Sequence, residues 1–277
     1  MFNLPSGVLA VSDLDPLIIT SPTIRSGTTL LQRLLCSAPK GFIFGENCAQ
    51  DLELFLRVYL SKSFMYSVNQ RQFAETLGAF INGQPQGWII DLMPDIDEYL
   101  QTLSRSCLAG IAYCRDYAKK AGRPVWGFKY PGLQPQSLQL MRQMMPACKI
   151  LYTHRDIVDC VKSAKARGTV SSAEDVREFC QQWADHLSFM LGLADDPAVF
   201  ILSYQDMVSR PEETITSIEK FTRLEGIRRD VLRLRVNAWD FESAKAQDGY
   251  IAPADLTEKE MEVINQVAVV LCSQLYG

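Results

Sequence analysis

The chain has few histidines, no close cysteine pair and no long apolar run, and each absence excludes a class of protein. Its two histidines, His154 and His186, lack zinc-ligand spacing, so we expect no metal site. The eight cysteines are scattered without a C-x-x-C pair, which is typical of thiols in a reducing compartment. No window approaches the roughly eighteen apolar residues of a membrane span, and the first residues do not resemble a signal peptide. These absences predict a cytoplasmic protein that does not contact a membrane.

An excess of positive charge is also absent. The formal net charge is −4 over 277 residues, of which 47% are hydrophobic and 22% charged. A protein of this charge has no global field that attracts nucleic acid, so any anion site has to be local. The length is sufficient for one large domain with an ample core. We find no repeat, low-complexity segment or linker, and we therefore expect residues 1–277 to form a single domain.

The most informative stretch is a short turn between an expected strand and an expected helix. Leu17–Ile19 is a branched apolar run, and apolar side chains recur at helical spacing after Gly27. The residues between them are small and are expected to leave backbone N–H groups and hydroxyls pointing outward, while Arg25 adds a planar cation. Because the first N–H groups of a helix have no internal partner, this arrangement predicts a cradle for a phosphate-like anion.

The loop differs from the triphosphate-binding loop of nucleotide kinases. The pattern G-x-x-x-x-G-K-[ST] places a Lys before the hydroxyl residue, where it reaches the β- and γ-phosphates. Here Gly27 stands directly before Thr28, and the positive charge lies upstream at Arg25. A nucleotide kinase, which would also need Mg²⁺, is therefore the weaker functional alternative. The other alternative is an ordinary strand-to-helix turn with no role in binding.

Strands alternate with helices along the rest of the chain. Further strands are expected at residues 42–44, 125–129, 149–153 and 198–202. Helices are expected as a pair within 47–83, then up to residue 121, at 173–193, from Pro211 and from Leu256. The alternation predicts one α/β domain with a central parallel sheet flanked by helices, interrupted by a helical insertion at 47–122.

Two of the expected strands end in basic residues. Lys129 closes the strand at 125–129, and Arg155 closes the strand that begins at residue 149. Ligands of open α/β sheets bind at the carboxyl ends of the strands, so both cations are expected near the anion loop. The pattern becomes helical from Asp156, which places Ser163 two turns into a helix and Arg167 one turn further on the same face.

Four motifs now resemble, in the same order, the sulfotransferases that use 3′-phosphoadenosine 5′-phosphosulfate (PAPS), over roughly residues 15–225. They are R-S-G-T-T-L-L at 25–31, W-G-F-K-Y-P at 126–131, R-D-x-x-D-x-x-x-S at 155–163, and S-Y-Q-D-M-V-S-R-P-E-E at 203–213. Ile24 and Ile157 stand where the family pattern has Pro. The resemblance implies a P-loop-like fold, PAPS as the co-substrate, 3′-phosphoadenosine 5′-phosphate (PAP) as the product, and no metal.

The resemblance also implies a role for each residue. Those expected at the 5′-phosphosulfate and the leaving group are Arg25, Ser26, Gly27, Thr28, Thr29 and Lys129, with Arg25 and Lys129 counted as catalytic. Those expected at the 3′-phosphate are Arg155 and Ser163, with Arg167 assisting, and Tyr204 is expected near the adenine or ribose. A noncatalytic nucleotide-binding module would keep Arg155 and Ser163 but would not need both Lys129 and Glu46.

The general base is assigned from spacing within the resemblance. Cytosolic aryl sulfotransferases use a His two residues after the Lys, but that position here is Pro131. Tyrosylprotein sulfotransferases and many bacterial relatives instead place a Glu 21 residues after the loop Arg, and residue 46 of this chain is Glu46. Glu46 is thus the predicted base, with a solvated loop carboxylate as the alternative.

The acceptor is expected to be small. Four carboxylates, Asp91, Asp95, Asp97 and Glu98, interrupt the insertion. They fit either a helix N-terminus, where acids interact favourably with the dipole, or a wall that attracts a cationic acceptor. The second interpretation favours a cationic specialised metabolite of the saxitoxin type, sulfated on oxygen or nitrogen, with a tyrosylprotein-type peptide as the alternative. The sequence leaves open whether the chain forms a homo-oligomer.

Overall fold

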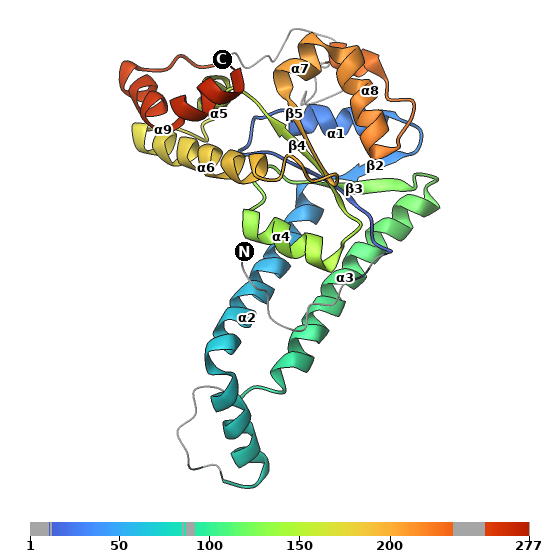
Figure 1. The fold of residues 1–277 in the computed structure, drawn as a ribbon, viewed down its shortest axis with the longest axis vertical. Coiled ribbons are helices and arrows are strands. Elements are labelled where there is room, and N and C mark those ends of the chain that lie inside the picture. The colour runs from blue at the N-terminus through green and yellow to red at the C-terminus, as the bar shows by residue number, and fades with distance from the viewer. Residues whose placement is uncertain (1–10, 12, 85, 87–91, 235–252, 277) are drawn as a thin grey trace.

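The computed structural model describes residues 11, 13–84, 86, 92–234 and 253–276. Within them, five parallel strands form one sheet in the order β2-β3-β1-β4-β5 (Figure 1). The strands are β1 (Leu17–Thr20), β2 (Gly41–Phe44), β3 (Val125–Lys129), β4 (Lys149–His154) and β5 (Val199–Ser203). The predicted α/β fold with a parallel sheet is confirmed, and the predicted strand limits agree to within one residue.

Helices pack on both faces of this sheet. They are α1 (Thr28–Ser37), α2 (Glu46–Ile81), α3 (Ile96–Lys120), α4 (Pro135–Met144), α5 (Ile157–Lys165), α6 (Ala173–Leu191), α7 (Tyr204–Ser209), α8 (Pro211–Thr222) and α9 (Glu258–Tyr276), with a short 3₁₀ helix at Arg229–Arg233. Buried side chains of α1, α7 and α8 form one core with one face of the sheet, and those of α2 to α6 and α9 form the other. The sheet is thus the middle of three layers.

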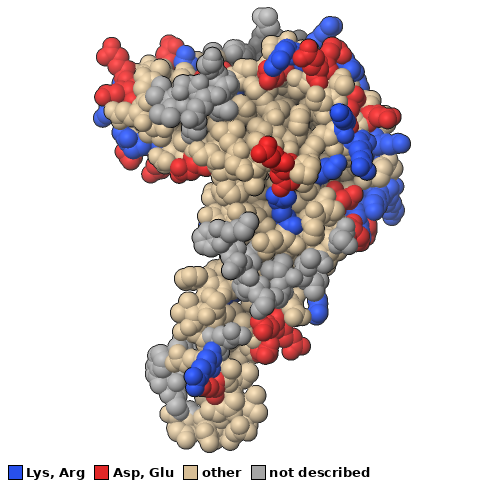
Figure 2. Space-filling model, viewed as in Figure 1, with Lys and Arg blue, Asp and Glu red and all other residues tan. Residues whose placement is uncertain are grey.

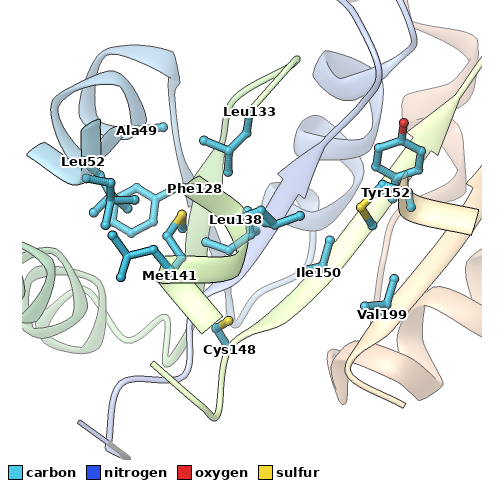
Figure 3. Packing of buried hydrophobic residues seen from close by; sticks show 14 of the residues in the cluster. Ala49, Leu52, Phe128, Leu133, Leu138, Met141, Cys148, Ile150, Tyr152 and Val199 are labelled. Atoms are coloured by element: carbon cyan, nitrogen blue, oxygen red, sulfur yellow. The ribbon is translucent and has the colours of Figure 1, made fainter. Parts of the chain in front are cut away.

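Alternation along the strands explains the two cores. Leu17 and Ile19 of β1 belong to the α1 side, whereas Ile18 between them belongs to the opposite side, as the two-residue period of a strand requires. On that opposite side, Figure 3 shows Phe128 of β3 between side chains of α2 and α4. The apolar strand runs that identified the sheet are therefore buried on both faces.

The order of the strands determines where a ligand can bind. The chain fills the β2-β3 side of β1 first and then crosses to β4 and β5 on the other side. The carboxyl end of β1 therefore lies at the point where the strand order reverses, which is where open α/β sheets bind their ligands. The loop that follows β1 is the one that the sequence predicts as an anion cradle.

The insertion forms a helical arm that extends away from the sheet (Figure 1). Two helices were predicted within 47–83, and α2 (Glu46–Ile81) consists of two helical stretches that meet at a kink at Asn69, whose φ is −125°. The surface of the arm visible in Figure 2 is largely uncharged. Phe64 and Val68 are among its exposed apolar side chains. No helix in the described part of the chain is long and apolar enough to cross a membrane.

The acids of the insertion have a structural role at the start of α3. Asp95 caps this helix, because its carboxylate accepts a hydrogen bond from the Glu98 backbone N–H at 2.9 Å. Asp97 and Glu98 lie in the first turn, where negative charge interacts favourably with the helix dipole. Asp91 lies outside the described residues. The helix N-terminus interpretation therefore accounts for the three described acids without a ligand.

The buried side chain of His154 is expected to make the free energy of unfolding depend on pH. Burial lowers its pKa from 6.5 to about 4, although the charge of Asp206 opposes the shift. Between these values the unfolded chain binds a proton that the folded chain does not, so the free energy of unfolding falls as the pH decreases from about 6.5 to about 4. A difference of about 2.5 pKa units corresponds to at most about 3 kcal/mol.

We expect urea unfolding to show this loss, and His154→Gln to reduce it because the variant has no proton to bind at this position. The measurement is the urea midpoint at neutral pH and near pH 4.5 for both proteins. An equal loss in the variant would show that other groups cause the pH dependence.

Candidate active site

The loop between β1 and α1 is held by its own hydroxyl groups. Ser21 Oγ donates to the Thr23 carbonyl at 2.7 Å, and Ser26 Oγ donates to the same oxygen at 3.0 Å. Thr153 Oγ1 of β4 donates to the Ser26 carbonyl at 3.2 Å. The Ser26 hydroxyl is therefore not one of the outward-pointing hydroxyls expected of this loop. Ser26 is fully buried, and its hydroxyl stabilises the loop that shapes the site.

Gly27 ends this loop and begins α1. Its φ of +96° lies in the left-handed region that glycine adopts without steric penalty. No side chain caps α1, and Thr28 and Thr29 form its first turn. The N-terminal N–H groups and the positive end of the helix dipole are thus available to an anion at the carboxyl edge of the sheet.

Three arginines gather beside the loop. Arg25 Nε donates to Ser163 Oγ of α5 at 2.9 Å, which joins the predicted 5′ and 3′ sites. Burial lowers the pKa of Arg25, and the charges of Arg167 and Arg155 lower it further. Arg167 was predicted on the same helical face as Ser163, but α5 ends at Lys165, so Arg167 lies in the turn beyond it. An anion bound among these cations would relieve their repulsion.

Arg155 is fixed at the end of β4 by two neighbours. Its Nε and Nη2 donate to Asp159 Oδ2 at 3.3 and 3.2 Å, so the second Asp of the R-D-x-x-D motif orients the guanidinium. Its Cζ lies 4.7 Å from the ring centroid of Tyr204, a cation–π contact. Tyr204 begins α7 directly after β5, which is paired in parallel with β4. The structure therefore brings Tyr204 next to Arg155.

Glu46 and Lys129 meet although 83 residues separate them. β2 and β3 are parallel neighbours, so Glu46, which begins α2 just after β2, lies beside Lys129 at the end of β3. The ammonium of Lys129 forms an ion pair with Glu46 Oε1. The Lys129 side chain is 7% exposed and that of Glu46 is 50% exposed. A buried cation and an accessible carboxylate are thus placed side by side.

This pair and the anion loop line one pocket of about 560 Å³. Arg25 and Thr29 contribute from the loop and α1, and Glu46 and Lys129 from the ends of β2 and β3. The other lining residues, among them Gln32 and Arg33 of α1, were not predicted as part of the site. The positions of Gln32 and Arg33 one turn into α1 were the only signal in the sequence, because helical spacing places them near Thr28 and Thr29.

A second pocket, of about 570 Å³, lies along the loop that follows Lys129. Glu53 and Arg57 of α2 line it, together with Tyr130 and Gln134 from the loop and Gln182 of α6. None of these residues was predicted as part of the site. Glu53 lies seven residues, or about two turns, after Glu46 on the same helix.

The comparison with protein families identifies the group to which these features belong. The profile described as "Sulfotransferase family" matches residues 16–228, from the start of the sheet to beyond α8. The chain belongs to the sulfotransferase family. The prediction of a PAPS-dependent sulfotransferase is thereby confirmed at the level of the family, whereas its acceptor and base are not addressed. The sequence comparison with curated proteins gave no match.

Solved structures give distant similarities to this sulfotransferase. The sulfotransferase domain of the Synechococcus PCC 7002 olefin synthase has 15% identity and a TM-score of 0.48, covering 97% of this chain and 98% of its own. Sulfotransferase STF9 of Mycobacterium avium has 14% identity and a TM-score of 0.46, covering 96% and 78%. Mouse sulfotransferase SULT7A1, solved with PAP, has 11% identity and a TM-score of 0.40, covering 95% and 66%. At these TM-scores, the similarities say nothing about the acceptor.

Gly27 provides a test of the loop geometry. A Cβ at Gly27 would lie 2.4 Å from Cδ2 of Tyr204 and would strain a backbone with φ of +96°. We expect Gly27→Ala to displace the ring that contacts Arg155 and to weaken PAP binding about tenfold, or about 1.4 kcal/mol. The control is Gly110→Ala, because Gly110 lines neither pocket and a Cβ there meets nothing within 4 Å. Calorimetric titration with PAP measures both, and equal affinities would contradict the geometry.

Proposed function

We propose that this sulfotransferase moves the sulfuryl group of PAPS onto a hydroxyl or nitrogen of a small cationic specialised metabolite. A saxitoxin-type guanidinium alkaloid is our best candidate. The observation that carries the proposal is the Glu46–Lys129 pair, which shares a pocket with Arg25 and Thr29 of the anion loop. The site thus combines a carboxylate that can accept a proton with cations that can hold a leaving anion.

The cation arrangement fits the two anionic ends of PAPS. We assign the 5′-phosphosulfate to Arg25, Lys129 and the start of α1 at Thr28 and Thr29, and the 3′-phosphate to the 155–167 region. Arg25 donates to Ser163, so the two binding regions are directly adjacent. The repulsion among Arg25, Arg155 and Arg167 supports an anionic ligand. Tyr204 would lie beside the nucleoside, because its ring contacts Arg155.

The chemistry follows from this placement. The acceptor atom forms a bond to sulfur while the bond from sulfur to the bridging phosphate oxygen breaks, in line and through a loose transition state like that of phosphoryl transfer. Glu46 accepts the proton of the acceptor, and Lys129 and Arg25 stabilise the negative charge on the departing PAP. We propose that these fixed cations replace a metal, and that the enzyme acts in the cytoplasm without nucleic acid or membrane.

A tyrosylprotein-type reaction is the second candidate, because Glu46 occupies the base position of that group. The experiment offers ³⁵S-labelled PAPS with saxitoxin, a tyrosine-containing acidic peptide, and neither. We expect label on the alkaloid. Label on the peptide alone would replace our acceptor by the second candidate. Label on neither acceptor, with PAP bound, would leave the nucleotide assignment standing and reject both acceptors.

A further inference from the structure

We infer that the second pocket binds the acceptor and that Glu53 binds a cationic group of that acceptor about two helical turns, or about 10 Å, from the atom that receives the sulfuryl group. The inference rests on the proposed function, because it takes Glu46 as the base. It adds a specificity-determining residue and a distance between the two functional groups of the acceptor.

The second pocket lies next to the transfer site along the chain and in space. Lys129 lines the first pocket, and the next residue, Tyr130, lines the second. The loop is held against the end of β1, because Tyr130 N donates to the Ile19 carbonyl and Gly132 N to the Ser21 carbonyl, both at 2.9 Å. The second pocket therefore opens at the same carboxyl edge of the sheet as the anion loop.

Helix α2 connects the two pockets. It begins at Glu46 and continues through Glu53, and seven residues of helix span about 10 Å and return to nearly the same face. The charges of both carboxylates raise the pKa of Tyr130, so the phenol lies within electrostatic reach of each. A molecule with its nucleophile at Glu46 can therefore extend along α2 to Glu53.

Glu53 is a carboxylate of this pocket that no cation pairs with in the described chain. It is 5% exposed, yet no Lys or Arg nitrogen of the described chain forms an ion pair with its carboxylate. Burial is the largest cause of the raised pKa of Tyr130, and its interaction with Glu53 comes next, so the phenol lies close to this carboxylate. Arg57 lines the same pocket but is exposed. A buried carboxylate is costly without a cation, and a bound guanidinium or ammonium would supply one.

The remaining walls favour a small polar molecule. Gln134, Gln136, Ser137 and Gln182 offer carboxamides and a hydroxyl that both donate and accept hydrogen bonds. The volume of about 570 Å³ lies in the range of pockets for small ligands. Gln182 Nε2 also donates to the Pro22 carbonyl at 3.4 Å, which holds α6 against the anion loop.

The test uses probes that differ only in charge and length. They are ω-guanidinoalkan-1-ols with butyl, hexyl and octyl chains, and the uncharged ureido analogue of each. Each probe is titrated calorimetrically into PAP-saturated protein, for wild type, Glu53→Gln and the control Glu75→Gln. Glu75 is on the same helix, but it is exposed and forms an ion pair with Arg71. Transfer of label from ³⁵S-PAPS to the probes is measured in parallel.

We expect wild type and Glu75→Gln to bind the hexyl guanidinium about tenfold or more tightly than its ureido analogue, because the charge-assisted hydrogen bonds to Glu53 are lost in the neutral probe. The hexyl guanidinium probe should bind more tightly than the butyl and octyl guanidinium probes. Glu53→Gln should abolish the charge preference and keep the affinity for PAP, which also shows that the variant folds.

Equal binding of the charged and neutral hexyl probes to wild type, including no binding of either, would overturn the inference, as would an unchanged preference in Glu53→Gln. Label transfer without a Glu53-dependent preference would reject the role of Glu53 and keep the sulfotransferase proposal. A Glu53-dependent preference without label transfer would support the binding role of Glu53. It would also show that the hydroxyl of the probe does not receive the sulfuryl group.

Discussion

Replacing Glu46 by glutamine is expected to lower kcat for sulfuryl transfer by about a hundredfold to ten-thousandfold, the usual contribution of a positioned general base. The carboxylate is half exposed at the start of α2 and lines the same pocket as Arg25 and Thr29. Glutamine keeps the shape of the side chain but cannot accept the proton of the acceptor. Affinity for PAP should change little, because PAP lacks both the sulfuryl group and the acceptor.

The matched control for this variant is Asp51→Asn. Asp51 is exposed on the same helix and lines neither pocket, so its substitution removes one negative charge without touching the site. Steady-state rates with ³⁵S-PAPS and calorimetric titration with PAP separate catalysis from binding. Near-normal turnover in Glu46→Gln would eliminate Glu46 as the base.

Replacing Lys129 by methionine is the second change with a large expected effect. The Lys129 side chain is 7% exposed and its ammonium pairs with Glu46, so methionine keeps the packing and removes the charge. We expect kcat to fall about a hundredfold to a thousandfold, as when one transition-state donor is removed, because the leaving oxygen loses a cation. Lys40→Met removes an exposed charge just before β2 and is the control.

The two variants should also be coupled. Because Glu46 and Lys129 are in direct contact, the double variant is expected to lose less activity than the two single losses multiplied together. Pre-steady-state measurement of PAP formation would report the transfer step itself. Full activity of Lys129→Met would show that Lys129 only neutralises Glu46.

The sheet could be predicted because its strands are short apolar runs that end at polar turns. Leu17–Ile19 and Val125–Lys129 are buried on both faces, so sequence and structure agree there. The inward turn of the Ser26 hydroxyl could not be predicted, because it depends on the carbonyl that the hydroxyl meets, here that of Thr23. The predicted position of Arg167 within the helix was wrong, because helical spacing does not say where a helix ends.

The candidate site was predictable only where a motif or the pairing of the strands determines a residue's position. Glu46 was found only through spacing shared with a family, and its meeting with Lys129 follows from the pairing of β2 with β3. Glu53 had no signal, because its burial and its place beside Tyr130 in one pocket arise only in the folded chain. Of the two interpretations of the acids near Asp95, the helix N-terminus agrees with the structure, because Asp95 caps α3.

The central claim is that the cations around the β1–α1 loop bind a nucleotide with phosphates at both the 3′ and 5′ positions. Calorimetric titration of the wild-type protein with PAP, and separately with ATP in the presence of Mg²⁺, tests it most directly. We predict micromolar binding of PAP without metal and much weaker binding of ATP. Preference for ATP with Mg²⁺ would contradict the account and would reassign the loop to a kinase.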